Sequence, residues 1–260
     1  MASRAHLEDR LRSLGRFAVA VSGGVDSLTL AALAWSLRPA VDVSLYFADS
    51  AAVPGHARRR VHDVAVARGW HVHVLDAGEV DDPAYQNNPV DRCYHCKSHL
   101  FDAVKQRTDV PVCTGANLDD TSDFRPGRIA ARERDVCEPF VDAGYTKDDV
   151  RALARDLDLG DIAELPASPC LSSRVETGVA IDHALLQVID AVEGAVRDLG
   201  SRVVRCRIRK SAAVIEHDGL IADDVVIAAA TPLLHVHGLR LPVQASGYRQ
   251  GSAFLRVLLA

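Results

Sequence analysis

The feature that most constrains the fold is a short apolar run that leads into two glycines and then into a helical pattern. Residues 17–27 read Phe-Ala-Val-Ala-Val-Ser-Gly-Gly-Val-Asp-Ser. Glycine allows a tight turn whose N–H groups can approach an anion. The start of a helix places partial positive charge at the same point. The segment therefore predicts a strand, an anion-binding loop and a helix, in that order.

The polar residues of this loop indicate which ligand it binds. Ser22 and Ser27 supply hydroxyl donors. Asp26 would repel a phosphate unless a divalent cation such as Mg²⁺ lay between them. No Lys follows Gly23 and Gly24, so the loop is neither a Walker A motif nor Gly-x-Gly-x-x-Gly. A tight turn in which Asp26 merely caps the helix is the alternative.

Strand-like and helix-like segments alternate along the first part of the chain. The predicted strands are 17–21, 41–47, 71–75, 110–114 and 136–140, and the predicted helices are 27–37, 55–68 and 96–107. Such alternation is typical of a doubly wound parallel sheet with helices on both faces. Ligands of these sheets bind beyond the carboxyl ends of the strands. The expected fold class is therefore α/β.

The pattern changes after Pro166 and Pro169. A predicted helix at 181–199 precedes three predicted strands, at 203–209, 213–217 and 241–245. A chain of 260 residues is long enough for one large domain and a small second one. We therefore expect a first domain over residues 1–175 and a smaller α+β unit over residues 176–260.

Composition and charge exclude several classes of protein. With 48% hydrophobic and 25% charged residues, the chain is neither disordered nor collagen-like. A net charge of −5 disfavours a dedicated nucleic-acid binder. No apolar run reaches the ~20 residues of a membrane span, and the charged N-terminal residues lack the apolar stretch of a signal peptide. We therefore expect a cytoplasmic protein whose six cysteines are thiols or metal ligands.

Four motifs together resemble one known family. Ser-Gly-Gly-Val-Asp-Ser (22–27) resembles the PP-loop of ATP pyrophosphatases, which cleave ATP between the α and β phosphates. The other three are Asn-Pro-Val-Asp-Arg-Cys-Tyr-His-Cys-Lys (88–97), Gly-Ala-Asn-Leu-Asp-Asp-Thr-Ser-Asp-Phe-Arg-Pro-Gly (115–127) and Pro-Ala-Ser-Pro-Cys-Leu-Ser-Ser-Arg (166–174). In this order they resemble the LarE family of ATP-dependent sulfur transferases.

The resemblance implies an enzyme that acts on a small molecule. LarE-like proteins use ATP and Mg²⁺ to adenylate the carboxylates of a nicotinic-acid-derived mononucleotide, and they convert them to thiocarboxylates for the nickel-pincer nucleotide. The resemblance implies no stable nucleic-acid partner, and it implies a homo-oligomer, a hexamer. Positions after strand ends and positions that match the family's motifs together give the candidate nucleotide and substrate site: Ser22, Gly23, Gly24, Val25, Asp26, Ser27, Ser50, Gly115, Asn117, Asp123, Arg125, Glu193, Arg205, Arg207 and Asp224.

Within this set, Arg205 and Arg207 alternate on a predicted strand and so share one of its faces. The guanidinium fork suits the oxygens of a phosphate group. The matching pair in LarE-like proteins lies at a phosphate-binding subunit contact. A solvated strand face is the alternative for these two residues.

Three cysteines are candidates for the sulfur chemistry. Cys93 and Cys96 lie three residues apart and would share a helix face, which suits a zinc site, a redox pair or two unrelated thiols. The resemblance implies that Cys170 supplies the sulfur. It also implies that a chain with all three thiols holds a [4Fe–4S] cluster whose open iron carries a sulfide. In the alternative, the sulfur atom of Cys170 itself is sacrificed.

Arg174 lies four residues after Cys170, where its charge would favour the thiolate. We also expect Arg174 to stabilise the charge that develops on the adenylated carboxylate. The remaining cysteines, Cys113, Cys137 and Cys206, fall in strand patterns and are expected to pack in the core.

Three rival functions remain at this point. A tRNA thiolase would share the loop and the cluster, but it needs basic surface to neutralise phosphates. A non-catalytic nucleotide-binding regulator would have no use for the three cysteines beside Arg174. An ammonia-using amide synthetase would not need Cys170.

Overall fold

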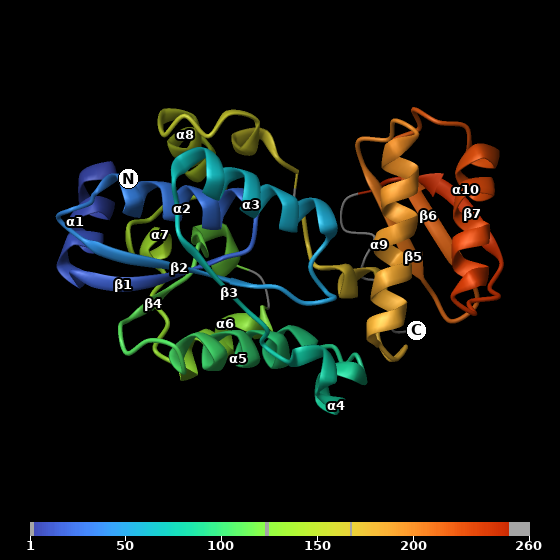
Figure 1. Cartoon of the computed structure of the whole chain (residues 1–260), viewed down its shortest axis with the longest axis horizontal. Coiled ribbons are helices and arrows are strands. Elements are labelled where there is room, and N and C mark those ends of the chain that lie inside the picture. The colour runs from blue at the N-terminus through green and yellow to red at the C-terminus, as the bar shows by residue number, and fades with distance from the viewer. Residues whose placement is uncertain (1–2, 123–124, 167, 250–260) are drawn as a thin grey trace. The chain divides into compact units, whose positions relative to one another are not determined.

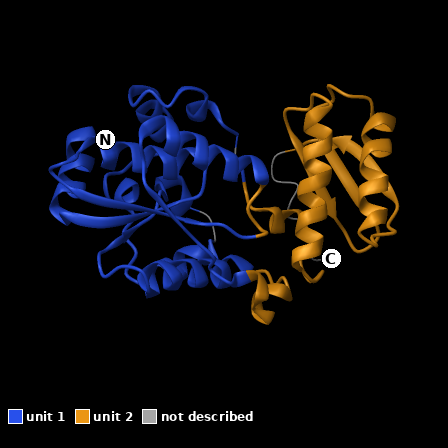
Figure 2. Cartoon of the chain, in the orientation of Figure 1, with its two compact units in different colours: residues 1–50, 55–79, 91–168 blue, residues 51–54, 80–90, 169–260 orange. Residues whose placement is uncertain are grey.

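The computed structural model describes residues 3–122, 125–166 and 168–249. The chain forms two compact units (Figure 2). The first contains Met1–Ser50, Gly55–Glu79 and Asp91–Ser168, and the second contains Ala51–Pro54, Val80–Val90 and Pro169–Ala260. The chain thus passes between the units several times, whereas the sequence suggested one boundary at residue 175.

A four-stranded parallel sheet forms the centre of the first unit. Its strands are β1 (Arg16–Val21), β2 (Asp42–Ala48), β3 (Val72–Leu75) and β4 (Val112–Cys113), in the order β3-β2-β1-β4. Because neighbouring strands are parallel, their carboxyl ends lie along one edge of the sheet. The loops that carry the candidate nucleotide site follow those ends.

Helices cover both faces of this sheet. In Figure 1, α2 and α3 lie on one face and α5 and α6 on the other. The nearly all-apolar sequence of α2 explains why most of its residues are buried. The helices of the first unit are α1 (Arg4–Leu14), α2 (Val25–Ser36), α3 (Gly55–Arg68), α5 (Arg92–Lys105), η2 (Leu118–Thr121), α6 (Pro126–Glu133), α7 (Pro139–Asp142), α8 (Lys147–Asp156) and η3 (Gly160–Glu164). The expected doubly wound α/β fold is confirmed.

One predicted strand is wrong. In the segment 136–140, Cys137 forms an isolated parallel bridge with Cys113, and α7 begins at Pro139. Proline has no N–H to donate to a neighbouring strand, so the ladder stops there.

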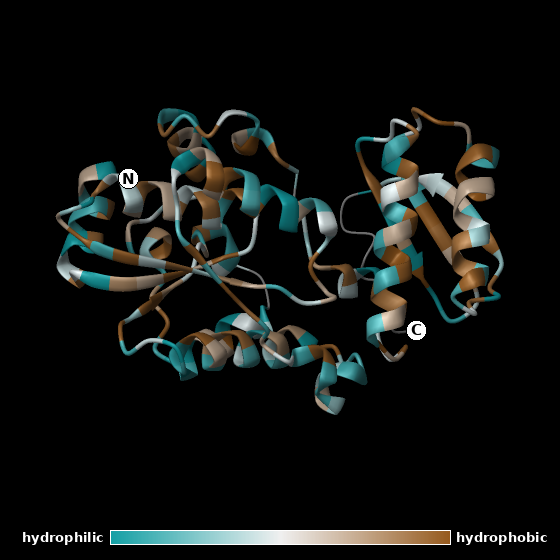
Figure 3. Cartoon of the chain, in the orientation of Figure 1, coloured by the Kyte–Doolittle hydropathy of each residue, from teal (hydrophilic) through white to brown (hydrophobic). Residues whose placement is uncertain are grey.

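The second unit has its own three-stranded sheet. Strands β5 (Val204–Ile208) and β6 (Ala213–His217) are antiparallel, and β7 (Val243–Gly247) pairs parallel with β6. The helices α9 (His183–Asp198) and α10 (Asp223–Val236) accompany the sheet. Figure 3 shows hydrophobic and hydrophilic residues alternating along α9, as expected of a half-buried helix. The α+β character expected for this part of the chain is present.

Two short segments from the first half of the sequence complete the second unit. The turn of η1 (Glu79–Asp81) leads into α4 (Pro83–Gln86), where Tyr85 is fully buried and its hydroxyl contacts Ser172 Oγ. The Asn88 amide, also buried, donates to the carbonyls of Glu176 and Val179 at 2.9 and 3.0 Å. The short helix η4 (Leu171–Arg174) follows the last passage between the units. In the described parts of the chain, no helix is long and apolar enough to cross a membrane.

Candidate active site

Of the two glycines of the loop after β1, Gly23 is required by the geometry of the loop. Gly23 has a φ of +76°, and a Cβ atom at this position would lie 2.7 Å from the carbonyl oxygen of Ala57. Gly24 is the N-cap of α2, whose first residue, Val25, is buried. The loop therefore presents free backbone N–H groups at the positive end of α2, an arrangement that binds phosphate.

The two serines of this loop have different surroundings. Ser27 is buried, and its Oγ accepts from the N–H of Ser22 at 3.0 Å and donates to the carbonyl of Gly24 at 3.2 Å. Ser22 is exposed. Ser27 therefore holds the loop closed, and the Ser22 hydroxyl is the one that a phosphate can reach.

Asp26 lies beside a lysine that the sequence analysis did not identify. Lys147, the first residue of α8, places its Nζ 2.6 Å from Oδ2 of Asp26. Both side chains are partly exposed, at 31% and 26%. Thr146 and Asp149 form the capping box that marks the start of α8, and Lys147 lies directly after Thr146. Because a cation is unfavourable in the first turn of a helix, this position of Lys147 was the signal in the sequence. The loop thus obtains from α8 the cation that its own sequence lacks.

The loop after β4 packs directly against the start of α2. A Cβ atom on Gly115 would lie 2.7 Å from the backbone nitrogen of Ser27, so only glycine fits there. Asn117 is buried, and its amide donates to Oδ1 of Asp26 at 3.3 Å. Arg125 pairs with Asp120 at 2.8 Å. The structure thus brings Gly115 and Asn117 to the loop after β1, whereas Asp123 lies outside the described residues.

The residues after β2 are held by neighbours in the same unit. Asp49 pairs with Arg58 at 2.6 Å. The Ser50 hydroxyl donates to the buried carboxylate of Glu79 at 2.5 Å. Ser50 therefore lies at the predicted edge of the sheet with its proton already engaged.

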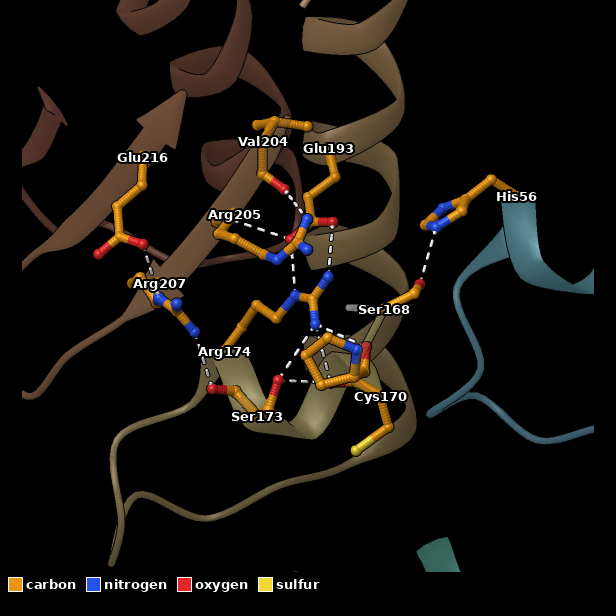
Figure 4. A network of polar contacts seen from close by, with 12 residues as sticks. His56, Ser168, Cys170, Ser173, Arg174, Glu193, Val204, Arg205, Arg207 and Glu216 are labelled. Carbon is orange, nitrogen blue, oxygen red and sulfur yellow. Dashed lines mark hydrogen bonds and ion pairs between the residues drawn. The ribbon is translucent and has the colours of Figure 1, made fainter. Parts of the chain in front are cut away.

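In the second unit, Arg174 and Glu193 form a fully buried ion pair (Figure 4). Nε and Nη2 of Arg174 contact the two carboxylate oxygens of Glu193 at 2.8 and 3.1 Å. Arg197 and the N–H of Cys206 donate to the same carboxylate, at 2.8 and 3.0 Å. The Arg174 Nη1 donates to the carbonyl oxygens of Pro169 and Cys170.

These contacts hold both residues within the second unit. Every nitrogen of the Arg174 guanidinium group donates to a protein acceptor. The Glu193 carboxylate is likewise surrounded by protein donors. In the structure, both residues support the loop that carries Cys170.

The charge state of the pair follows from its environment. Burial alone would raise the pKa of Glu193, but the positive charge of Arg174 and then that of Arg197 outweigh it and lower the pKa. Burial acts to lower the pKa of Arg174, and the carboxylate of Glu193 raises it. Both groups are therefore charged at neutral pH.

Arg205 and Arg207 lie on the same face of β5, as their alternation predicts, and both are buried. Arg207 pairs with Glu216 at 3.0 Å and donates to the carbonyl of Ser173. The Arg205 guanidinium lies over the ring of Tyr248, 5.5 Å from its centroid. Burial, and then the charge of Arg174, lower the pKa of Arg205. Asp224 is exposed in the first turn of α10.

The three candidate sulfur residues belong to different units. Cys93 and Cys96 lie near the start of α5, in the first unit, and Cys170 lies in the second. Over residues 3–122, 125–166 and 168–249, no three His, Cys, Asp or Glu side chains gather to hold one metal ion. Among the described residues of the first unit, α5 thus supplies two thiols, and no third metal ligand lies beside them.

The other three cysteines are mainly core residues. Cys113 and Cys206 are buried, as predicted, and burial raises the pKa of Cys206. Cys137 is half-buried, and its contact with Cys113 lowers its pKa to about 7.

The sequence is similar to those of three proteins from other organisms. No family model matches the chain. It is 33% identical over 225 residues to an uncharacterized protein of Synechocystis (81% of this chain, 82% of the relative), and 30% identical over 212 residues to one of Methanocaldococcus jannaschii (80% and 78%). It is 30% identical over 217 residues, 82% of this chain and 78% of the relative, to the pyridinium-3,5-bisthiocarboxylic acid mononucleotide synthase of Lactiplantibacillus plantarum. With this similarity across both units, the chain belongs to the LarE family of sulfur transferases.

Proposed function

We propose that this protein is an ATP-dependent sulfur transferase that converts the carboxylates of a pyridinium dicarboxylate mononucleotide to thiocarboxylates. The name of the Lactiplantibacillus relative supports the substrate class. The observation that carries the use of ATP is the glycine loop at the start of α2, with Asp26 and Lys147 beside it. In the proposed reaction, a substrate carboxylate attacks the α-phosphorus and pyrophosphate leaves. Sulfide then displaces AMP from the acyl adenylate.

The residues around the loop suit the phosphates of ATP. The Asp26 carboxylate is a hard oxygen donor of the kind that Mg²⁺ prefers, and we propose that it holds this ion. Bound there, Mg²⁺ would neutralise phosphate charge as pyrophosphate departs. Lys147, released from Asp26, would donate to a phosphate oxygen. The backbone N–H groups after Ser22 would hold the remaining oxygens.

The second unit offers charge for the phosphate of the substrate. Around Cys170 it gathers four guanidinium groups and two carboxylates, which leaves two positive charges. These groups belong to Arg174, Arg197, Arg205, Arg207, Glu193 and Glu216. A phosphate monoester carries close to two negative charges at neutral pH. We therefore propose Arg205 and Arg207 as the residues that bind the mononucleotide phosphate.

For the source of sulfur we propose a [4Fe–4S] cluster held by Cys93, Cys96 and Cys170. Thiolates are the usual ligands of such a cluster. The pair on α5 fits two ligand positions, and the third thiol belongs to the other unit. Bound there, the cluster would supply a replaceable sulfide.

The products of ATP cleavage test the adenylation step. Wild-type protein with the dicarboxylate mononucleotide should form AMP and pyrophosphate, and Asp26→Asn should abolish this because the metal loses a ligand. Asp63→Asn, at an exposed position of α3, is the control and should retain activity. Formation of ADP and phosphate would refute the proposal.

Iron analysis after oxygen-free purification tests the sulfur source. A cluster requires close to four irons and four acid-labile sulfides per chain. Cys93→Ala should abolish repeated turnover, whereas Cys113→Ala should not. A colourless protein whose Cys93→Ala variant still transfers one sulfur, leaving dehydroalanine at residue 170, would instead establish a sacrificial Cys170.

A further inference from the structure

We propose that Arg174 is a positioning residue that fixes the peptide bearing Cys170, and that Glu193 holds its guanidinium group in place for this purpose. The inference rests on the proposed function, in which Cys170 takes part in sulfur delivery. It gives Arg174 and Glu193 a role that does not require either residue to touch the substrate.

Three donors converge on the carbonyl oxygen of Cys170. They are the Ser173 N–H at 3.0 Å, the Ser173 hydroxyl at 2.7 Å and Arg174 Nη1 at 3.0 Å. The same Nη1 donates to the carbonyl of Pro169 at 2.7 Å. The Leu171 N–H, which belongs to the same peptide group as the Cys170 carbonyl, donates to the carbonyl of Ala52 at 2.8 Å. The backbone on both sides of the Cys170 side chain is therefore held by hydrogen bonds.

The guanidinium group is in turn fixed by regular elements of the second unit. Glu193 lies on the buried face of α9 and accepts two hydrogen bonds from Arg174. The N–H of Cys206, on β5, binds the same carboxylate and so orients it. A helix and a strand thus set the plane of the guanidinium group, and that plane sets the position of the Cys170 carbonyl.

Two observations favour positioning over stability as the role of this pair. Arg174 has no exposed surface, and a buried ion pair is seldom more stable than an apolar pair of the same volume. In Figure 4, the sulfur of Cys170 points away from the guanidinium group, while its carbonyl oxygen lies within hydrogen-bond distance. The five fixed donors of arginine can hold a carboxylate and two carbonyls at once, which the single ammonium of lysine cannot do.

The test compares Arg174→Lys with Arg202→Lys. Both variants replace an arginine of the second unit by lysine, but Arg174 is buried against the Cys170 loop, whereas Arg202 is exposed. The readouts are the melting temperature, AMP formation, thiocarboxylate formation and the rate at which iodoacetamide alkylates Cys170 in iron-free full-length protein.

For Arg174→Lys we expect AMP formation within about twofold of wild type and thiocarboxylate formation at least about tenfold slower, as when a reacting group is misplaced by less than 1 Å. Cys170 should be alkylated at least about threefold faster, because its loop is less restrained. Arg202→Lys should match wild type in all three rates.

A folded Arg174→Lys variant that transfers sulfur and is alkylated at wild-type rates would overturn the proposal. A variant whose rates of AMP formation and thiocarboxylate formation fall by the same factor would overturn it too. If wild-type protein makes no thiocarboxylate, the proposed function fails, but the alkylation rates still test the positioning.

If Arg174→Lys does not fold, the pair Arg174→Gln with Glu193→Gln removes both buried charges together. The same selective loss of transfer is expected of it, and normal transfer would refute the role. Ser173→Ala, which removes one donor to the Cys170 carbonyl, should produce a smaller change in the same direction.

Discussion

At the scale of single residues, an ion pair lies beside the loop after β1, and its two members could each bind part of the proposed Mg²⁺–nucleotide ligand. Asp26 and Lys147 neutralise each other at 2.6 Å. Binding of Mg²⁺ and a polyphosphate would offer each of them a different partner of opposite charge. The ion pair therefore keeps both side chains next to the loop, at the low energetic value of a partly exposed salt bridge.

Replacement of Lys147 tests this interpretation. Lys147→Met should lower the rate of AMP formation by about 10²–10³-fold, the usual effect of removing one charge-stabilising donor. Folding should be little affected because the pair is partly exposed. Lys105→Met, at an exposed position near the end of α5, is the matched control. A Lys147→Met variant with the wild-type rate would exclude a catalytic role.

Two glycines give opposite predictions for the same substitution. Gly115→Ala should destabilise the first unit and weaken ATP binding, because its Cβ would lie 2.7 Å from the backbone of Ser27. Gly194→Ala should stabilise the second unit by about 0.5–1 kcal/mol, because Gly194 lies inside α9 with open space around it. Urea unfolding of both variants checks the signs, and equal signs would contradict this account.

At the scale of elements, hydrophobic patterns predicted most of the fold. The helix predicted at 55–68 is α3, and the predicted strands 203–209 and 213–217 pair as β5 and β6. The segment 136–140 has the apolar residues of a strand, but Pro139 cannot continue one. The loop after β1 was identified because its whole motif is contiguous. Lys147 was not, since only tertiary structure brings α8 to α2.

The position of Glu193 in α9 shows that an apolar helix pattern can predict a buried ion pair. It occupies the apolar face of α9 together with Leu186, Ile189 and Val196. A carboxylate in such a position requires a buried cation, and the sequence alone could not identify Arg174 as that cation. The spacing therefore reveals that Glu193 has a partner without revealing which one.

The ion pair between Glu193 and Arg174 makes the free energy of unfolding depend on pH. The folded-state pKa of Glu193 lies below its ordinary value of 4.5, so its contribution is complete above pH 4.5 and is lost as the pH falls through the folded-state pKa. The free energy of unfolding of wild type should therefore fall below pH 4.5 more steeply than that of Glu193→Gln. Asp198→Asn, exposed at the end of α9, serves as the control and should keep the wild-type slope. Identical slopes for wild type and Glu193→Gln would contradict the shift.

At the scale of the whole molecule, the two units are not two consecutive stretches of sequence. The second unit takes residues 51–54 and 80–90 from the first half of the chain. A boundary inferred from local pattern cannot detect this, because the segment around Tyr85 has no helical or strand periodicity of its own beyond the four residues of α4. The contacts that define the unit are long-range ones, such as the N–H of Ile181 to the carbonyl of Gln86 at 2.8 Å.

This arrangement predicts that the fragment 169–260 does not fold by itself. The fragment would lack the side chains of Val80, Tyr85 and Asn88, which are at most 2% exposed in the full chain. Without them it should show no cooperative thermal transition by circular dichroism and a poorly dispersed amide NMR spectrum.

In the full chain, Tyr85→Ala should cost about 3–5 kcal/mol of unfolding free energy, the usual effect of removing a buried aromatic ring. Val90→Ala, in the same segment but 73% exposed, should change it by less than about 0.5 kcal/mol. Chemical denaturation gives both values. A fragment that unfolds cooperatively, or a Tyr85→Ala variant as stable as Val90→Ala, would show that residues 80–90 only rest on the second unit. The predicted outcome instead makes them part of its core, so that the unit carrying Cys170 folds only when the first half of the chain has supplied this segment.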